Sequence, residues 1–243
     1  MKEDAGQAGT SRLAAPVLLL LVAAALFTAL GVWQVERLAW KEALIARVES
    51  RVDAPPVALP DEAAARASSL PDREYLRVRM AGEYLASGTA LVRAVTVQGA
   101  GYWVMTPLRT ADGRLIYVNR GYVPVGSKLD AARAQTPSGP VEIIGLLRLS
   151  EPKGGFLRSN DPARDAWYSR DVAALAQARG LAHVAPFFVD AQTQTPTAPG
   201  DPVAGLTVIR FPNSHLSYAL TWFAMAALSA GLAGWLWRRG AAA

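Results

Sequence analysis

Two long apolar runs, one near each end of the chain, dominate its hydrophobic pattern. Residues 13–35 and residues 216–237 contain no Asp, Glu, Lys or Arg. A helix needs about 20 residues to cross a hydrocarbon core of about 30 Å, and it satisfies its own backbone groups there. Tryptophans stand at the ends of the runs, where amphipathic rings prefer the headgroup level: Trp33, Trp235 and Trp237. The pattern predicts transmembrane helices at 13–35 and 215–237.

The first run has an alternative interpretation as a cleaved signal peptide. Its apolar region is longer than the roughly 7–15 residues of such a signal. No A-x-A cleavage site stands clearly at its far end, which reads ALGVW over residues 29–33. We therefore favour an uncleaved anchor. Two buried helices of a soluble protein are a weaker alternative, because apolar runs at the two extremes of a chain make a poor globular core.

The charges that flank the two runs predict their orientation. Arg238 and Arg239 follow the second run directly, and only Arg210 lies close before it, which favours a cytoplasmic C-terminus. The residues around the first run point the other way, since more basic residues follow it than precede it. A long loop translocates largely regardless of its charge, so the short tails decide. Residues 1–12 and 238–243 are then cytoplasmic tails, and residues 36–214 lie outside the inner membrane.

The middle region begins as a helix and then changes to strands. Apolar residues keep a helical spacing over 36–52, and Ala54-Pro55-Pro56 breaks it. Residues 61–66 predict a short helix capped by Asp61, and residues 171–179 predict another that Gly180 ends. The strands are expected at 75–84, 89–97, 102–110, 115–123, 141–149, 187–189 and 206–209.

The turns between these strands indicate how they pair. Asp112-Gly113 lies between two apolar runs, which is a strong hairpin signal. Residues 152–162 and 195–205 are rich in Pro and Gly and are expected to be loops. The fold class is therefore an α+β membrane protein. Its two transmembrane helices flank a mostly antiparallel β domain with short helices, built as a compact barrel or sandwich.

Composition narrows the chemistry. The chain has two histidines and no cysteine, so it lacks a thiolate nucleophile and cannot build a multi-histidine metal site alone. Walker, H-E-x-x-H and G-x-S-x-G motifs are missing from the sequence. The net charge of +5 is scattered, without the dense basic stripe of a nucleic-acid-binding protein. We expect a protein that is not an enzyme and does not bind nucleic acid.

Of the two histidines, His215 is the candidate for function, whereas His183 is expected to be a surface or turn residue. His215 stands where the second apolar run begins, after Asn213 and Ser214, either of which suits a helix cap. Steps of three and four return to one helix face, so His215, Tyr218, Trp222 and Met225 are expected on one stripe. Polar stripes on membrane helices often face protein or a ligand.

One ligand that suits this stripe is haem, since imidazole is a common axial ligand of haem iron. Its propionates would pair with cations near the membrane surface, for which Arg37, Lys41 and Arg210 are candidates. The alternative is an interfacial histidine that caps the helix or reaches the headgroups. Trp33, Arg37 and Trp40 share a face of the first helix. They form either an aromatic belt or a contact surface for the second helix, a cofactor or a partner subunit.

Four motifs occur in an order that resembles the Surfeit-locus protein 1 family of cytochrome c oxidase assembly factors. They read Gly31-x-Trp33-Gln34-x-x-Arg37-x-x-Trp40-Lys41, then Tyr102 with Thr106-Pro107-Leu108, then Val118-Asn119-Arg120-Gly121-Tyr122-Val123-Pro124, and Asn213-x-His215-x-x-Tyr218-Ala219-x-Thr221-Trp222. The resemblance covers the chain from about residue 13 to 239, with one apolar run at each end.

This resemblance implies a multi-pass protein of the inner membrane whose main domain lies in the periplasm. It implies partnership with oxidase subunit I and with other oxidase assembly factors. It also implies binding of haem a, with His215 as the axial ligand of the haem iron and with Tyr218 and Trp222 at the family's following positions. The alternative is a scaffold that stabilises subunit I without binding haem, in which His215 merely caps a helix.

Asn119-Arg120-Gly121 also has two interpretations. Gly121 supplies a backbone conformation at a strand end, and Arg120 pairs with a carboxylate; or Arg120 contacts the client protein. We favour the structural interpretation, since turn glycines usually serve backbone geometry.

Overall fold

The computed structural model describes residues 4–61, 70–155, 157–207, 209 and 211–241. The chain divides into two compact units. One is helical and comprises residues 1–47 and 210–243, and the other comprises residues 48–209. The short helix expected at 61–66 lies almost wholly outside the described residues.

The helical unit contains α1 (Asp4–Val52) and α5 (His215–Ala241). Within them, Ala14–Val52 and His215–Gly240 are long and apolar enough to cross a membrane. Only 11% and 17% of their most apolar windows are buried, so they are unlike the core helices of a soluble protein. The continuation of the first helix over residues 36–52 is confirmed. It ends just before Pro55 and Pro56, which cannot donate a backbone hydrogen bond.

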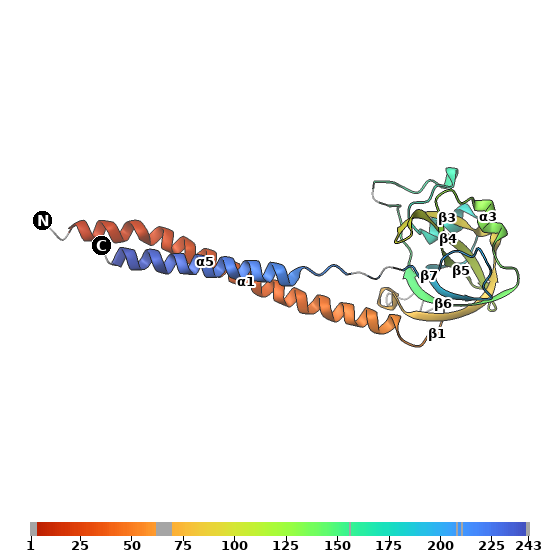
Figure 1. Ribbon diagram of the computed structural model, residues 1–243, viewed down its shortest axis with the longest axis horizontal. Helices are drawn as coiled ribbons and strands as arrows, with labels where there is room; N and C mark the ends of the chain where they lie inside the picture. Colours follow the sequence, from red (N-terminus) through yellow and green to blue (C-terminus); the bar gives the residue numbers. More distant parts are fainter. Residues whose placement is uncertain (1–3, 62–69, 156, 208, 210, 242–243) are drawn as a thin grey trace. The chain divides into compact units, whose positions relative to one another are not determined.

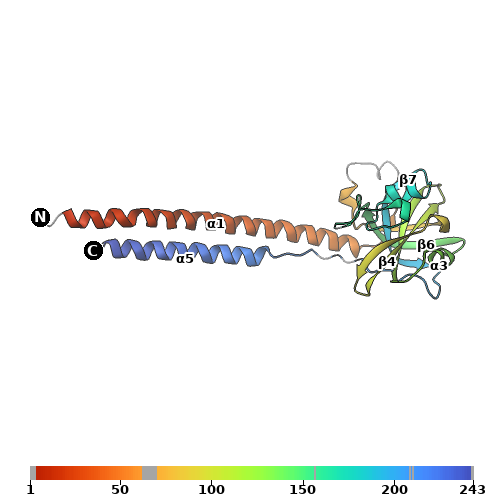
Figure 2. The same ribbon diagram turned by 90° about the horizontal axis from the view of Figure 1, so that it is seen from above.

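The two long helices run side by side in opposite directions (Figures 1 and 2) and meet along a seam of small residues. Ala219, Ala226 and Ala233, spaced by seven, are the buried residues of α5. A seven-residue repeat keeps one face of a helix against its neighbour, and small residues let membrane helices approach closely. The approach is tightest at Gly31 of α1, where a Cβ atom would lie 2.6 Å from the ring of Phe223.

The second unit is a barrel made from a seven-stranded sheet. Its strands are β1 (Val57–Ala58), β2 (Arg77–Tyr84), β3 (Ala90–Thr96), β4 (Gly99–Thr110), β5 (Leu115–Pro124), β6 (Pro140–Leu149) and β7 (Val184–Thr195). The short helices are α3 (Leu129–Ala134), α4 (Val172–Ala178) and three 3₁₀ turns, Pro71–Arg73, Ala86–Gly88 and Pro162–Arg164.

The barrel closes because β2 pairs with β6 on one side and with β4 on the other. The ring therefore runs β2, β6, β7, β5, β4 and back to β2, with β1 and β3 added at its margins. Most neighbours are antiparallel, whereas β5 with β7 and β1 with β2 are parallel. The predicted fold class is confirmed, and the sheet is a barrel.

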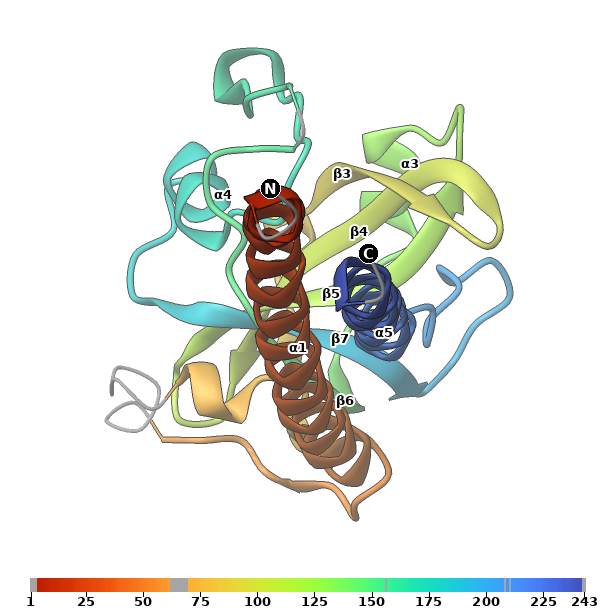
Figure 3. The same ribbon diagram turned by 90° about the vertical axis from the view of Figure 1, so that its left-hand side faces the viewer.

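Alternating burial explains why these segments fold as strands. In β2, Val78 and Met80 point into the core while Arg79 and Ala81 are exposed. β5 is buried on both faces, since Ile116 and Val118 lie in the inner core and Tyr117 packs in an outer cluster with Val172 and Leu175 of α4, which lies to one side in Figure 3. The inner core includes Leu108, Ile116, Val118, Ile143, Leu147, Phe187 and Val189. The outer cluster under α4 includes Met105, Tyr117, Trp167, Leu175 and Phe188.

Most predicted elements are confirmed, with shifts of a few residues. Leu115 pairs with Arg109 across the Asp112-Gly113 turn, so the hairpin is as predicted. The helix at 171–179 begins at Asp171, whose side chain accepts a hydrogen bond from the backbone amide of Ala174. α3 was not expected from the sequence.

The strand predicted at 206–209 is wrong, because none of its described residues lies in a strand. This part of the chain joins the barrel slightly earlier, where Val203 makes an isolated bridge with Tyr122. Gly205 then donates a backbone hydrogen bond to Ala191, after which the chain leaves the sheet.

Candidate functional site

The candidate site lies at the start of α5, where backbone amides need acceptors. The side-chain oxygen of Asn213 accepts from the backbone amide of His215, at 3.4 Å. The backbone oxygen of Ser214 accepts from the amide of Tyr218 and from the hydroxyl of Ser217. Of the two capping candidates, Asn213 therefore accepts with its side chain and Ser214 with its backbone oxygen, and α5 begins at His215.

The side chain of His215 reaches across the seam to α1. Its Nδ1 lies 2.8 Å from Oε1 of Gln34, whose residue is only 8% exposed. A carboxamide oxygen can only accept, so Nδ1 donates and carries the ring proton. When the ring is neutral, the other nitrogen, Nε2, has the lone pair. Among the described residues, this is the only hydrogen bond that the ring makes, which leaves Nε2 able to bind a metal ion.

Aromatic rings flank this histidine along the seam. Trp222 of α5 stacks on Phe27 of α1, with ring centroids 5.6 Å apart. Phe223 closes over Gly31, one turn of α1 before Gln34. The seam therefore carries planar apolar side chains about two helical turns from His215, of a kind that suits a flat macrocycle.

Cationic side chains lie one and two turns further along α1. The guanidinium of Arg37 lies 4.2 Å from the ring centre of Trp40 and is exposed. The Nζ atom of Lys41 lies 5.6 Å from the ring centre of Phe211, just before α5. Lys41 can meet a carboxylate at the end of the seam, and Arg37 can meet one on the exposed face beside it. Arg210, the third candidate, lies outside the described residues.

The expected stripe of His215, Tyr218, Trp222 and Met225 lies on one face of α5, but its members differ in exposure. His215 and Trp222 contact α1, whereas Tyr218 is 55% exposed and Met225 is 36% exposed. The physical reason is the seven-residue seam, which brings residues 215, 219, 222 and 226 to α1. Tyr218 falls one position beside it and remains open to its surroundings.

The stripe of Trp33, Arg37 and Trp40 lies on an exposed face of α1. The second helix instead contacts the neighbouring stripe, which contains Phe27, Gly31 and Gln34. Of the contact-surface interpretations, the second helix is thus ruled out for the exposed rings. An aromatic belt, a cofactor or a partner subunit fits their exposure.

The donor set at the seam fits a haem better than a bare metal ion. Within the described part of the chain, no three His, Cys, Asp or Glu side chains gather to hold an ion. A haem brings four nitrogen ligands of its own and needs one axial nitrogen from the protein, which His215 Nε2 offers. His183, in contrast, is exposed and sits at a positive φ of 55°, so the turn assignment is confirmed.

In the barrel, the Asn119-Arg120-Gly121 motif has a structural role. Arg120 is buried and donates to Asp201, Thr136 and the backbone oxygen of Gln135. Gly121 has φ of 134°, and a Cβ atom there would lie 2.4 Å from the backbone oxygen of Val203. The structural interpretation is therefore confirmed.

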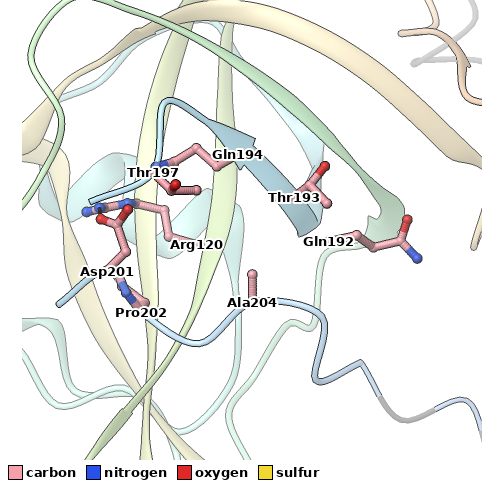
Figure 4. A pocket seen from close by; sticks show the side chains of 8 residues that line it. All are labelled: Arg120, Gln192, Thr193, Gln194, Thr197, Asp201, Pro202 and Ala204. Atoms are coloured by element: carbon pink, nitrogen blue, oxygen red, sulfur yellow. Dashed lines mark hydrogen bonds and ion pairs between the residues drawn. The ribbon is translucent and has the colours of Figure 1, made fainter. Parts of the chain in front are cut away.

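Arg120 and Asp201 also form one end of a pocket of about 350 Å³, with Gln192 at the other end (Figure 4). Burial lowers the pKa of Arg120, which Asp201 partly offsets. The pocket's larger polar groups are already engaged, since Gln194 accepts from the Tyr84 hydroxyl and Gln192 accepts from Arg77. The pocket therefore offers few free groups to a ligand.

A buried ion network that the sequence did not predict joins strands of the barrel to the segment that follows β7. Asp190 of β7 accepts from Arg148 at 3.1 Å, from Arg170 at 3.0 Å and from Asn119 at 2.8 Å. Thr207, on the segment that leads toward α5, donates to the same carboxylate at 3.0 Å. These bonds tie the middle of β7 to Thr207, on the segment that follows the barrel.

Glu151 belongs to this network through Arg170. Burial acts to raise the pKa of Glu151, but the hydrogen bonds and charge of Arg170 outweigh it and hold the pKa below its usual value. Burial likewise acts to lower the pKa of Arg170, but Asp190 and Glu151 outweigh it and raise that pKa. Both groups are therefore charged at neutral pH.

The fold and the site define a class of protein: a two-span membrane protein in which one histidine forms a hydrogen bond across the helix seam and a barrel domain lies between the spans in sequence. Comparison with known proteins identifies the family. The SURF1 family model matches residues 21–227.

Several relatives align with this chain over most of their length. Surfeit locus protein 1 of Mus musculus is 37% identical over 232 residues, covering 88% of this chain and 72% of the mouse protein. The Homo sapiens protein of the same name is 37% identical over 235 residues, covering 88% and 74%. A SURF1-like protein of Monosiga brevicollis is 36% identical over 223 residues, covering 86% and 82%. The chain belongs to the SURF1 family, as the resemblance predicted.

Proposed function

We propose that this protein is an assembly factor for haem–copper cytochrome c oxidase that binds haem a and assists its insertion into subunit I. The observation that carries the proposal is the bond from His215 Nδ1 to Gln34 Oε1, at 2.8 Å, which leaves Nε2 free for an axial ligand bond. Membership of the family supports the oxidase as the client. In this proposal the protein carries the haem, and the haem brings the iron that the client needs.

Each residue of the site has a proposed part in holding the cofactor. His215 ligates the iron through Nε2, and the nearby rings of Trp222 and Phe27 exclude water from the seam. Arg37, Lys41 and Arg210 pair with the propionates, as cations near a membrane surface suit carboxylates. Tyr218, which is exposed beside His215, borders the haem or the client.

The location follows from the spans and the charged tails. The protein is proposed to be a multi-pass protein of the inner membrane, with cytoplasmic residues 1–12 and 238–243 and with the barrel in the periplasm. Subunit I, other oxidase assembly factors and membrane lipid are its proposed partners. It carries its cofactor rather than catalysing a reaction, so we propose no enzymatic activity.

The decisive experiment is the visible spectrum and haem extract of the detergent-purified full chain, expressed in cells that make haem a. His215→Ala should weaken or abolish the haem a spectrum. His183→Ala is the matched control, because His183 is the chain's other histidine and is exposed in a turn. A colourless wild-type chain, or a spectrum that survives His215→Ala, would contradict haem ligation by His215.

A second candidate function is a scaffold that stabilises subunit I without haem. The exposed Trp33, Arg37 and Trp40 favour it, because they form a contact stripe that α5 leaves uncovered. Recovery of subunit I with both the wild-type chain and His215→Ala, neither of them coloured, would support the scaffold.

A further inference from the structure

We propose that Gln34 is a positioning residue that sets how tightly His215 holds iron, and that its neutral carboxamide keeps this hold weak enough for release. The inference rests on the proposed function, in which His215 ligates haem. Gln34 does not touch the iron in this scheme. It acts on Nε2, the ring nitrogen that faces away from it, through its hydrogen bond with Nδ1.

Gln34 is held rigidly enough to position another side chain. It lies on the seam face of α1, three residues after Gly31 and seven after Phe27, and both of these residues contact α5. The residue is buried, with only 8% of its surface exposed. Because α5 is locked against α1 on the same face, the carboxamide oxygen and His215 Nδ1 are presented to one another at 2.8 Å.

The partner of one ring nitrogen governs the other. A donor bond from Nδ1 fixes the tautomer in which Nε2 has the lone pair, and it fixes the plane of the ring. A carboxylate in that position would draw the Nδ1 proton more strongly and make Nε2 a better electron donor. A neutral amide draws it less. In a site of low dielectric constant this difference is enlarged, since hydrogen bonds are electrostatically stronger there.

A carrier needs such a compromise. It must orient its ligand well enough to bind the cofactor, and it must give the cofactor up to its client. The amide of Gln34 orients His215 without the full donor strength that a carboxylate would give. A glutamine at this position of the seam therefore suits a protein that must both bind and release its cofactor.

Two substitutions of nearly the same shape separate positioning from simple packing. Gln34→Met keeps the length of the side chain and its helix propensity but removes the amide oxygen. Gln34→Glu keeps the shape and makes the acceptor anionic. Val35→Leu, at the next and more exposed position of α1, is the control for a change on the same helix.

The first measurement uses the full-length apoprotein in nanodiscs and needs no haem. The chain has two histidines, so ¹⁵N-histidine NMR gives two sets of ring signals, and His215→Ala assigns them. Wild type should show His215 with the proton on Nδ1. Gln34→Met should lose this preference, and Val35→Leu should keep it. A wild-type ring protonated on Nε2 would overturn the proposal.

The second measurement loads the same proteins with iron protoporphyrin IX at pH 8 and follows its transfer to excess apomyoglobin. Gln34→Met should release it about 10–100-fold faster than wild type, as expected for loss of a ligand's hydrogen-bonding partner. Gln34→Glu should release it more slowly and should lower the midpoint potential of the iron. Release at the wild-type rate from both variants would overturn the proposal.

The two measurements also distinguish the inference from the function on which it rests. A wild-type chain that binds no haem overturns both the carrier function and the tuning of iron by Gln34, while the apoprotein NMR still reports the bond between Gln34 and His215. If the wild-type chain binds haem and both Gln34 variants release it at the wild-type rate, only the inference is overturned. Circular dichroism melts of each variant show whether it is folded.

Discussion

Trp222 and Phe27 stack at a position that sets the register of the two long helices. Their ring centroids are 5.6 Å apart, and the ring planes are inclined by 24°. His215 precedes Trp222 by seven residues and Gln34 follows Phe27 by seven, so in an antiparallel pair the hydrogen bond lies two helical turns along the seam from the stacked rings. The aromatic pair therefore holds the hydrogen-bonded pair in register.

The first prediction concerns this register. Trp222→Ala removes the larger ring of the stack, so we expect looser helix packing, a lower Tm in detergent and faster loss of bound haem. The effect on helix association should be about 1–2 kcal/mol, as for single interactions between membrane helices. The control is Trp235→Ala on the same helix, because Trp235 is about half exposed and should change haem retention little. Equal effects of the two substitutions would contradict a role for the stack.

Gly31 provides a second test of the seam. Gly31→Ala would place a Cβ atom 2.6 Å from the Phe223 ring, so either the ring or the helix must move. We expect a lower Tm and weaker haem binding, with partial recovery in the double variant Gly31→Ala/Phe223→Ala. The matched control is Gly234→Ala in α5, where a Cβ atom meets nothing within 4 Å. Thermal melts of the purified full chain compare all four proteins. If Gly31→Ala and Gly234→Ala have the same Tm, a close approach of Gly31 to the Phe223 ring is contradicted.

Periodicity and turn chemistry were sufficient to predict most of the fold. The two apolar runs, the helical spacing over 36–52 and the Asp112-Gly113 hairpin are local signals, and the structure confirms each of them. The parallel pairing of β5 with β7 is not local, since it joins segments about 70 residues apart, such as Asn119 and Asp190. The strand predicted at 206–209 failed for a similar reason. Its apolar residues suit a strand, but the structure pairs the chain with β5 at Val203 instead.

The candidate site was predictable in part. The sequence singled out His215, because it is one of two histidines and stands where a membrane helix begins. It did not identify Gln34 as its partner, since only the packing of the helices shows which α1 residue faces it. The sequence also placed Tyr218 on one face of the helix with His215, but it could not show that Tyr218 lies beside the seam rather than in it. Similarly, no local sequence pattern predicts that Asp190 pairs with Arg148 and Arg170, because the three residues come from separate segments of the barrel.

The buried network at Asp190 gives a third prediction. Asp190→Asn keeps the shape of the side chain but leaves Arg148 and Arg170 without the buried carboxylate between them. Breaking a buried ion pair in this way costs about 3–5 kcal/mol of the free energy of unfolding. The control is Glu142→Gln, which breaks a half-exposed pair with Arg79 and should cost about 0–1 kcal/mol. Urea unfolding of the full chain, followed by tryptophan fluorescence, measures both. Similar losses would show that the network stabilises the barrel no more than a surface pair does.

The last prediction concerns acid. Arg170 holds the pKa of Glu151 below its usual value of 4.5, so the folded protein binds a proton at Glu151 less readily than the unfolded chain does. The stabilisation from this pair is then fully present above about pH 4.5 and is lost as the pH falls through the folded-state pKa. The difference in unfolding free energy between wild type and Glu151→Gln should therefore be constant from pH 7 to about 5 and should shrink at lower pH. Urea unfolding at half-unit steps of pH measures it. A difference that is smallest near pH 7 and grows toward acid would mean that burial, rather than Arg170, dominates the pKa of Glu151.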